Sequence, residues 1–234
     1  MLFRFPKPKL NLDIVTYRQE ILELYPIDYT KKFIPRWYKD MPANVSETPI
    51  HEPTLKGCVA VQDLFNNGLC IPIWSDCIMY KDEKFNMKFS DGLTEVHFHP
   101  EHQWKYYLDG DRYLQFKIIS PWAIRTKSNI KFVFTGFHWG LNPFNIHIPT
   151  AIMRFKYSHG TNINGFLDMN SFNKASLNVG KPLVQIIPLT DSQIKLNYHL
   201  EDTKTFYGNQ NKFRLYFINA HKRLEKRIKE KNDT

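Results

Sequence analysis

Short apolar runs separated by regularly spaced turn sequences restrict the fold of this chain more than any other feature. Between Leu55 and Pro188, turn signals recur roughly every 8–12 residues, a spacing typical of β-sandwiches and barrels. Residues 84–89, Lys-Phe-Asn-Met-Lys-Phe, alternate polar and apolar side chains with a period of two, as a half-buried strand requires. The pattern predicts a mainly β protein, built as an antiparallel β-sandwich or barrel.

The clearest turn signal is Asp109-Gly110, which lies between two runs of β-forming residues, 104–108 and 112–119. This arrangement predicts a tight β-hairpin. Asp91-Gly92 predicts a second tight turn. The other runs assigned to the β region share apolar, β-branched or aromatic residues: 58–65, 69–74, 76–80, 84–89, 93–98, 130–135, 152–157, 164–169 and 183–188.

Three segments have helical patterns. Asp13 can cap a short helix that extends to about Leu24, with its apolar residues on one stripe. Pro35 favours the start of a second helical segment over residues 33–42. An apolar stripe among basic residues predicts a final amphipathic helix over residues 211–231.

These patterns divide the chain into three parts. Residues 1–53 form an extended and helical N-terminal segment that packs on the body, and their last part, 43–53, has the prolines of a linker loop. Residues 54–207 form the β-sandwich or barrel, and residues 208–234 form the basic C-terminal helix.

The charge balance restricts the partners. The chain has 32 Lys and Arg against 23 Asp and Glu, a net charge of +9, which can indicate a polyanionic partner. From Lys212 to the end, eight Lys and Arg stand against three Asp and Glu, so more than half of the surplus lies in the last segment. We therefore expect no nucleic-acid partner for the body. No apolar run approaches ~18 residues and residues 1–9 lack the apolar core of a secretory signal, so we expect no membrane partner.

The cysteines give no sign of a metal centre. Cys58, Cys70 and Cys77 have spacings that match no zinc signature, and we expect reduced, buried thiols. The sequence has no Gly-rich phosphate loop, no Gly-x-Ser-x-Gly elbow and no His-Glu-x-x-His motif. No complete catalytic motif is therefore present.

His97, His99 and Gln103 form the densest cluster of side chains that can bind a metal. Residues two apart on a strand point to the same face, so both imidazoles can share a divalent transition metal. His138 or His147 could supply a fourth ligand. The alternative is a strand end with exposed histidines, because a proline follows the second of them directly.

The spacing of this cluster between Gly92 and Gly110 resembles the first motif of the cupins, where two His and a Glu, joined by a later His, hold a metal inside a barrel. The resemblance implies a metal-dependent enzyme that activates oxygen or water at an open coordination position. Gln103 stands where the acidic ligand of that motif belongs, and the second cupin motif is absent from the sequence.

Trp122 and Arg125 lie in the phrase Ser-Pro-Trp-Ala-Ile-Arg-Thr, whose proline suggests a strand edge or break. We interpret Trp122 as a core residue. Arg125 is either a phosphate-binding residue or a solvated one.

Seven phrases occur in a fixed order along the chain: Tyr25-Pro, Phe33-Ile-Pro-Arg-Trp-Tyr-Lys, Leu55-Lys-Gly-Cys-Val-Ala-Val-Gln-Asp, Gly68-Leu-Cys-Ile-Pro-Ile-Trp-Ser-Asp, His99-Pro-Glu-His-Gln, Ser120-Pro-Trp-Ala-Ile-Arg-Thr and Gly180-Lys-Pro-Leu-Val-Gln-Ile-Ile-Pro. Together they resemble an uncharacterised family of marine tailed phages, especially T4-like cyanophages, which carries no assigned activity. The resemblance implies a protein of the virion, the host cytoplasm or both, with other phage or host proteins as partners. The resemblance is also compatible with a homo-oligomer.

The phrases Gly165-Phe-Leu-Asp168 and Gly180-Lys-Pro-Leu-Val-Gln-Ile-Ile187 are also similar to the last strands of trimeric dUTPases and dCTP deaminases. That resemblance implies a β-barrel and places Asp168 near the base or sugar of a nucleotide. The Pro-Arg-Ser phosphate segment of dUTPases is missing from the sequence.

The leading hypothesis is therefore a non-enzymatic phage protein without a cofactor, acting as a virion component, an assembly factor or a host-interaction factor. The first alternative is a cupin-like enzyme that uses a divalent transition metal at the histidine cluster. The second alternative is a dUTPase-like nucleotide-binding protein.

Overall fold

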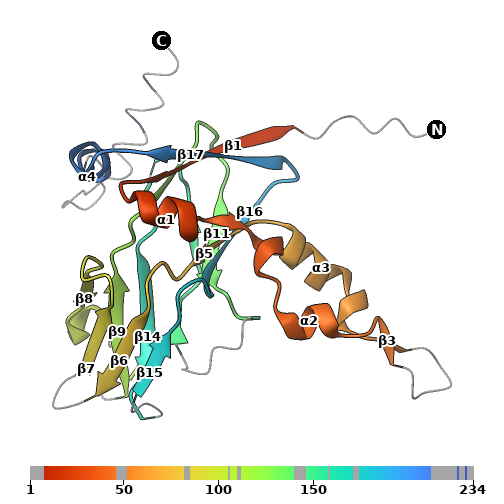
Figure 1. Ribbon diagram of the computed structural model, residues 1–234, viewed down its shortest axis with the longest axis horizontal. Coiled ribbons are helices and arrows are strands. Elements are labelled where there is room, and N and C mark those ends of the chain that lie inside the picture. Colours follow the sequence, from red (N-terminus) through yellow and green to blue (C-terminus); the bar gives the residue numbers. More distant parts are fainter. Residues whose placement is uncertain are drawn as a thin grey trace.

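Strands form most of the regular structure of the chain (Figure 1). The computed structural model describes residues 8–45, 52–81, 85–104, 106–109, 112–139, 146–157, 159–170 and 174–211, together with Lys226 and Glu230. Within these residues the protein is mainly β, which confirms the predicted fold class. None of the described sheets closes on itself as a barrel.

The strands of the described residues form five sheets. The largest has the order β13 (Ala151–Met153), β11 (Phe132–Gly136), β16 (Pro182–Pro188), β5 (Leu69–Pro72) and β2 (Asp28–Tyr29). A second has the order β12 (Ile146–His147), β14 (Ile163–Asp168), β9 (Tyr113–Ile118) and β8 (Val96–Phe98). A third has the order β10 (Trp122–Arg125), β1 (Lys9–Thr16) and β17 (Gln193–Leu200). The remaining two contain β15 (Lys174–Leu177), β6 (Cys77–Lys81) and β7 (Phe85–Phe89), and β3 (Asn44–Val45) with β4 (Glu52–Pro53).

The helices are short. They are α1 (Gln19–Leu24), α2 (Arg36–Asp40), α3 (Val59–Asn66) and α4 (Thr203–Asn211), with the 3-10 turns η1 (Thr30–Phe33), η2 (Leu55–Gly57) and η3 (Glu101–Gln103). The second predicted helical segment is confirmed, because η1 and α2 flank Pro35. None of the helices in this part of the chain is long and apolar enough to cross a membrane.

The first predicted helix begins too early. Asp13 does not cap a helix, because it lies inside β1, which pairs with β10 on one side and runs parallel to β17 on the other. The alternating residues Leu10, Leu12 and Ile14 are buried, and the β-branched run after Asp13 favours an extended backbone. The helix itself begins only at Gln19.

Two further local predictions are wrong. The apolar run 58–65 forms the helix α3 instead of a strand, and its buried residues, Val61 and Phe65, are four apart, which is the helical spacing. The predicted strand 104–108 is not a strand in the described residues. Instead, β9 pairs with β8 and β14, so the loop between the paired strands is much longer than a tight hairpin turn.

Most of the other predicted strands are present as β5, β6, β7, β8, β11, β14 and β16. In the run 152–157 the strand ends at Met153. Phe155 and Tyr157 lie in a turn, and both are buried, so the sequence alternates as a strand would although the backbone is not a strand. The predicted linker 43–53 contains β3 and β4. The final helix predicted over 211–231 lies mostly outside the described residues, and the described helix α4 begins earlier, at Thr203.

Among the described residues the core has two large clusters and a small one formed by Val15, Ala123 and Phe206. The larger one fills the space among the sheets and includes the fully buried residues Leu12, Ile14 and Trp122. The second, which we call the aromatic lobe, joins η1, α2 and α3 to the end of β11 through Tyr38, Val61, Phe65, Cys70 and Phe137, with Phe33, Ile34, Trp37, Cys58 and Trp139 packed against them. Figure 1 shows α2, α3 and β3 projecting away from the sheets.

Candidate functional site

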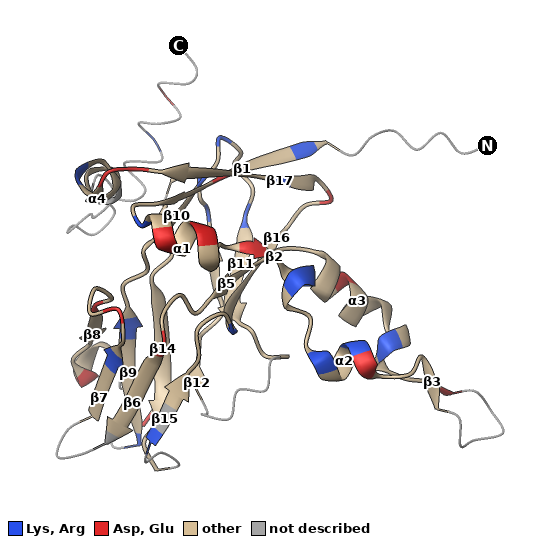
Figure 2. Cartoon of the chain, in the orientation of Figure 1, with Lys and Arg blue, Asp and Glu red and all other residues tan. Residues whose placement is uncertain are grey.

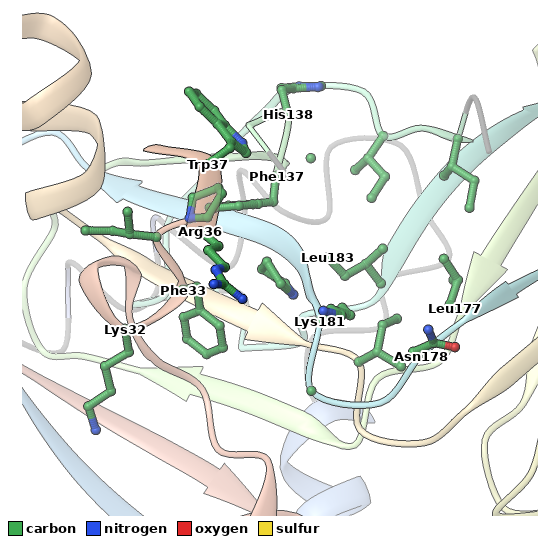
Figure 3. A pocket seen from close by; sticks show the side chains of 18 of the residues that line it. Lys32, Phe33, Arg36, Trp37, Phe137, His138, Leu177, Asn178, Lys181 and Leu183 are labelled. Carbon is green, nitrogen blue, oxygen red and sulfur yellow. The ribbon is translucent and has the colours of Figure 1, made fainter. Parts of the chain in front are cut away.

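A cleft of about 960 Å³ lies where the aromatic lobe meets the sheets, and we call it the lobe cleft (Figure 3). Residues 32–37 of η1 and α2 form one side. Residues 136–138 at the end of β11 form a second side, and residues 176–178 and 180–183, from the end of β15 to the start of β16, form a third. The cleft therefore joins segments that lie far apart in the sequence.

Aromatic contacts fix the lobe side of the cleft. Trp37 stacks on Trp139 with ring centroids 6.1 Å apart and an interplanar angle of 28°, and its Nε1–H donates to the Trp139 carbonyl at 3.2 Å. Tyr38, the next residue, packs on Phe65 of α3 with centroids 4.7 Å apart. Pro35 immediately precedes α2 with a φ of −60°, which its ring favours. The contacts of Trp37 and Tyr38 therefore fix the side of the cleft that α2 forms.

The opposite side carries Lys181 on an anchored turn. Gly180 has a φ of +79°, a left-handed conformation that glycine adopts without strain. Its N–H donates to the Ile73 carbonyl at 2.7 Å, and the Lys181 carbonyl accepts from the Ile73 N–H at 2.8 Å. The backbone at Lys181 is therefore fixed beside β5, while its side chain is exposed.

The charges in the lobe cleft have one sign. Lys32, Arg36, Lys181 and the imidazole of His138 line it, and none of the described lining residues is Asp or Glu. Lys32 forms an ion pair with Asp28, outside the lining. Arg36 Nε donates to Asp40 at 3.1 Å on α2, where Figure 2 shows basic and acidic residues together. In Figure 3 the ends of Arg36 and Lys181 point toward the middle of the cleft, whereas Lys32 points away.

The predicted metal ligands make separate local contacts. His97 Nε2 lies 3.2 Å from Glu95 Oε2, and His99 Nδ1 lies 2.7 Å from Gln103 Oε1. His99 is half-buried, and the other three residues are exposed. In the described residues, no group of three or more His, Cys, Asp or Glu is placed to hold a metal ion.

The two candidate fourth ligands lie on other elements. His138 follows β11 at the rim of the lobe cleft, with its Nε2 3.2 Å from Thr135 Oγ1. His147 lies on β12, with its Nε2 2.9 Å from the Tyr107 hydroxyl. β12 and β8 are the opposite edges of one sheet, three strand spacings or roughly 14 Å apart, so the structure does not bring strand residues His147 and His97 together.

Trp122 and Arg125 lie on β10, away from the lobe cleft. Trp122 is fully buried, as expected for a core residue. Arg125 forms a bidentate ion pair with Glu201, with nitrogen–oxygen distances of 2.6 and 2.9 Å. Hydrogen bonds from Arg125 hold the pKa of the Glu201 carboxyl below its usual value. Burial, helped by the Arg125 charge, lowers the pKa of His159 to about 4.

Asp168 ends β14 and is also held by a neighbour. Arg112 Nε and Nη2 donate to its Oδ2 at 3.1 and 2.7 Å, and the Asn170 N–H donates to its Oδ1 at 3.0 Å. Asp168 does not line the lobe cleft. Its contacts within the described residues are those of a carboxylate that closes a turn.

The cysteines are free thiols. Cys70 and Cys77 are buried, and burial raises the pKa of each thiol to about 12. A buried thiol with such a pKa is almost entirely protonated at neutral pH, which makes it a poor nucleophile. Cys58 is only partly buried and packs against the aromatic lobe.

Sequence reasoning did not select Lys32, Arg36, Trp37 or Lys181 as site residues. One signal was present, because two of the seven phrases quoted above, 33–39 and 180–188, supply residues on opposite sides of the lobe cleft. Their proximity depends on packing between distant segments, which no local pattern contains.

No family model matches this sequence, and no curated protein matches it.

Proposed function

We propose that this chain is a non-enzymatic, phage-encoded protein that acts by binding other proteins, as a virion component, an assembly factor or a host-interaction factor. The seven ordered phrases between residues 25 and 188 support the phage origin by resemblance. The proposal requires no cofactor.

The observation that carries the proposal is the pairing of the polar residues that the sequence singled out. Arg125 binds Glu201, Asp168 binds Arg112, and His99 contacts Gln103. The pairs with Glu201 and Arg112 each join two different segments of the chain. The two ion pairs stabilise the fold, and the bonds of all three pairs would have to break before their groups could act on a substrate.

The aromatic lobe supports the binding role. It projects from the sheets in Figure 1, and it carries two exposed apolar side chains, Leu55 at 46% and Val59 at 67% exposure. These residues are four apart at the junction of η2 and α3. A projecting element with exposed apolar residues suits contact with a second protein.

Mass spectrometry of purified particles of the encoding phage tests the virion version, and affinity purification of the tagged chain from infected cells tests the other two. We expect the chain in the particles or in a stable complex with phage or host proteins. A Leu55→Glu/Val59→Glu variant should lose the complex, and Leu93→Glu, at an exposed apolar position on another element, should keep it. Absence from particles together with purification of the chain alone would contradict the proposal.

A further inference from the structure

We infer that the lobe cleft binds a small organic anion that carries an apolar group. This inference goes beyond the proposed function and does not depend on it, because it concerns a cleft that none of the residues selected from the sequence except His138 lines.

The charge of the cleft favours an anionic ligand. Arg36 and Lys181 approach from opposite sides, and Figure 3 shows both side-chain ends directed toward the middle. Arg36 bonds Asp40 only through Nε among its described contacts, which leaves its terminal nitrogens directed to the cleft, and Lys181 has no ion-pair partner among the described residues. Both side chains are exposed, Arg36 at 94%, so solvent and salt screen their charge; two cations that line the same cleft still favour a carboxylate, sulfonate or phosphate between them.

The remaining lining requires an apolar body on the same ligand. Phe33 and Trp37 line the cleft from the lobe, and Leu177 and Leu183 line it from the sheets. Phe33 and Trp37 are half-buried, so part of each ring faces the cleft and can stack on a flat group. The wall is already fixed by the Trp37–Trp139 contact, so little ordering is needed when a ligand binds.

The size of the cleft selects against a simple ion. A volume of about 960 Å³ lies near the upper end of the range of roughly 300–1,000 Å³ found for small-molecule sites. Inorganic phosphate would occupy one end and leave the apolar walls in water. An organic phosphate or carboxylate with an aromatic or aliphatic portion uses both features at once.

The test uses the full chain and the probe 8-anilinonaphthalene-1-sulfonate, an aromatic sulfonate whose fluorescence rises in an apolar site. We expect saturable binding that weakens as salt is added. Lys181→Glu and Arg36→Glu should each weaken the affinity about tenfold or more, and Lys181→Arg should retain most of it. Lys195→Glu, the same charge change on β17 outside the cleft, is the matched control and should bind like the wild type.

Circular dichroism melts of each variant establish that it folds as the wild type does. Unsaturable binding, or equal affinity in folded wild type, Lys181→Glu and Arg36→Glu, would overturn the inference. If either charge variant fails to fold, the milder Lys181→Gln and Arg36→Gln replace it, with the same expected direction.

Displacement of the probe then defines the ligand class. Thymidine monophosphate and decanoate supply the two sources of an organic anion, one aromatic and one aliphatic, and displacement by either supports the inference. Inorganic phosphate at the same concentration should displace little. Equal displacement by inorganic phosphate, or no displacement by either organic anion, would overturn the requirement for an apolar group and with it the inference. Particle association is measured separately, so the two proposals fail independently.

Discussion

The sheets and the lobe cleft differ in how their charged side chains are partnered. Among the sheets, described cations meet carboxylates: Arg18 binds Asp91, Arg112 binds Asp168, and Arg125 binds Glu201. In the lobe cleft, Arg36 and Lys181 face each other with no described carboxylate in the lining. Charge alone therefore does not mark a functional site. Ion pairs that are buried or half-buried stabilise the fold, whereas exposed cations that face a cleft, including Arg36 with its exposed partner Asp40, are available to attract a ligand.

The largest expected effect is at Asp91. This carboxylate is largely buried, accepts from Arg18 Nη1 at 2.6 Å, and also accepts from the Thr94 hydroxyl and the Leu93 and Thr94 N–H groups. Asp91→Ala would leave the buried Arg18 paired with Glu20 alone, and should lower the free energy of unfolding by about 3–5 kcal/mol. Urea unfolding measures the change.

The matched control is Asp40→Ala, which removes the exposed partner of Arg36 in the lobe. It should change the free energy of unfolding by no more than about 0.5 kcal/mol. If Asp91→Ala and Asp40→Ala lost the same free energy of unfolding, the Arg18–Asp91 and Arg36–Asp40 pairs would not differ in strength, against this account.

Acid should weaken the pairs among the sheets. For Asp91, burial by itself raises the pKa, but hydrogen bonds from Arg18 and Thr94 outweigh burial and hold the pKa below the usual value. A depressed folded-state pKa stabilises the protein above the unfolded-state pKa of about 4, and this stability is lost as the pH falls through the folded-state pKa. The melting temperature should therefore fall below about pH 4, and the fall should be smaller in Asp91→Asn than in the wild type. An identical pH dependence in both would rule out this contribution.

A smaller effect is expected at Arg125. Arg125→Ala removes both hydrogen bonds to the partly buried Glu201 and should lower the free energy of unfolding by about 1–3 kcal/mol. Probe binding in the lobe cleft should not change, because Arg125 lies on β10 outside it. Weakened probe binding in a folded Arg125→Ala protein would favour the phosphate-binding interpretation of this residue.

The smallest effect is expected at the histidine cluster. A His97→Ala/His99→Ala double variant removes exposed contacts to Glu95 and Gln103, and its stability should differ from the wild type by no more than about 0.5 kcal/mol. Elemental analysis of protein purified without chelator should find no stoichiometric transition metal. About one metal per chain in the wild type, lost in the double variant, would instead establish the cupin-like alternative.

Local patterns predicted the strands whose residues alternate or are uniformly apolar. β7 and β16 are examples, because the order of polar and apolar residues in each strand indicates which faces are buried. β17 was missed because its exposed positions include Gln193, Lys195 and His199, and it is held by pairing with β1 rather than by its own composition. β10 was missed because a proline directly precedes it.

The site was predicted less well than the fold, for a physical reason. His97, His99 and Gln103 are close in sequence, so a pattern search finds them, yet each contacts only a near neighbour. Arg36 and Lys181 lie on opposite sides of one cleft because the aromatic lobe packs against the end of β11 beside β16. Such long-range packing depends on the whole core. It cannot be predicted from a single sequence that has no local motif for it.

The most direct test of the contrast between the two regions measures Arg125→Ala and Lys181→Glu in the same two assays, urea unfolding and probe binding. We expect Arg125→Ala to lose stability and keep wild-type affinity for 8-anilinonaphthalene-1-sulfonate. We expect Lys181→Glu to keep wild-type stability and lose about tenfold or more of the affinity. If both variants lost stability and affinity to the same extent, the distinction would be contradicted. Arg125 and Lys181 would then not differ as a residue that stabilises the fold and a residue that binds a ligand.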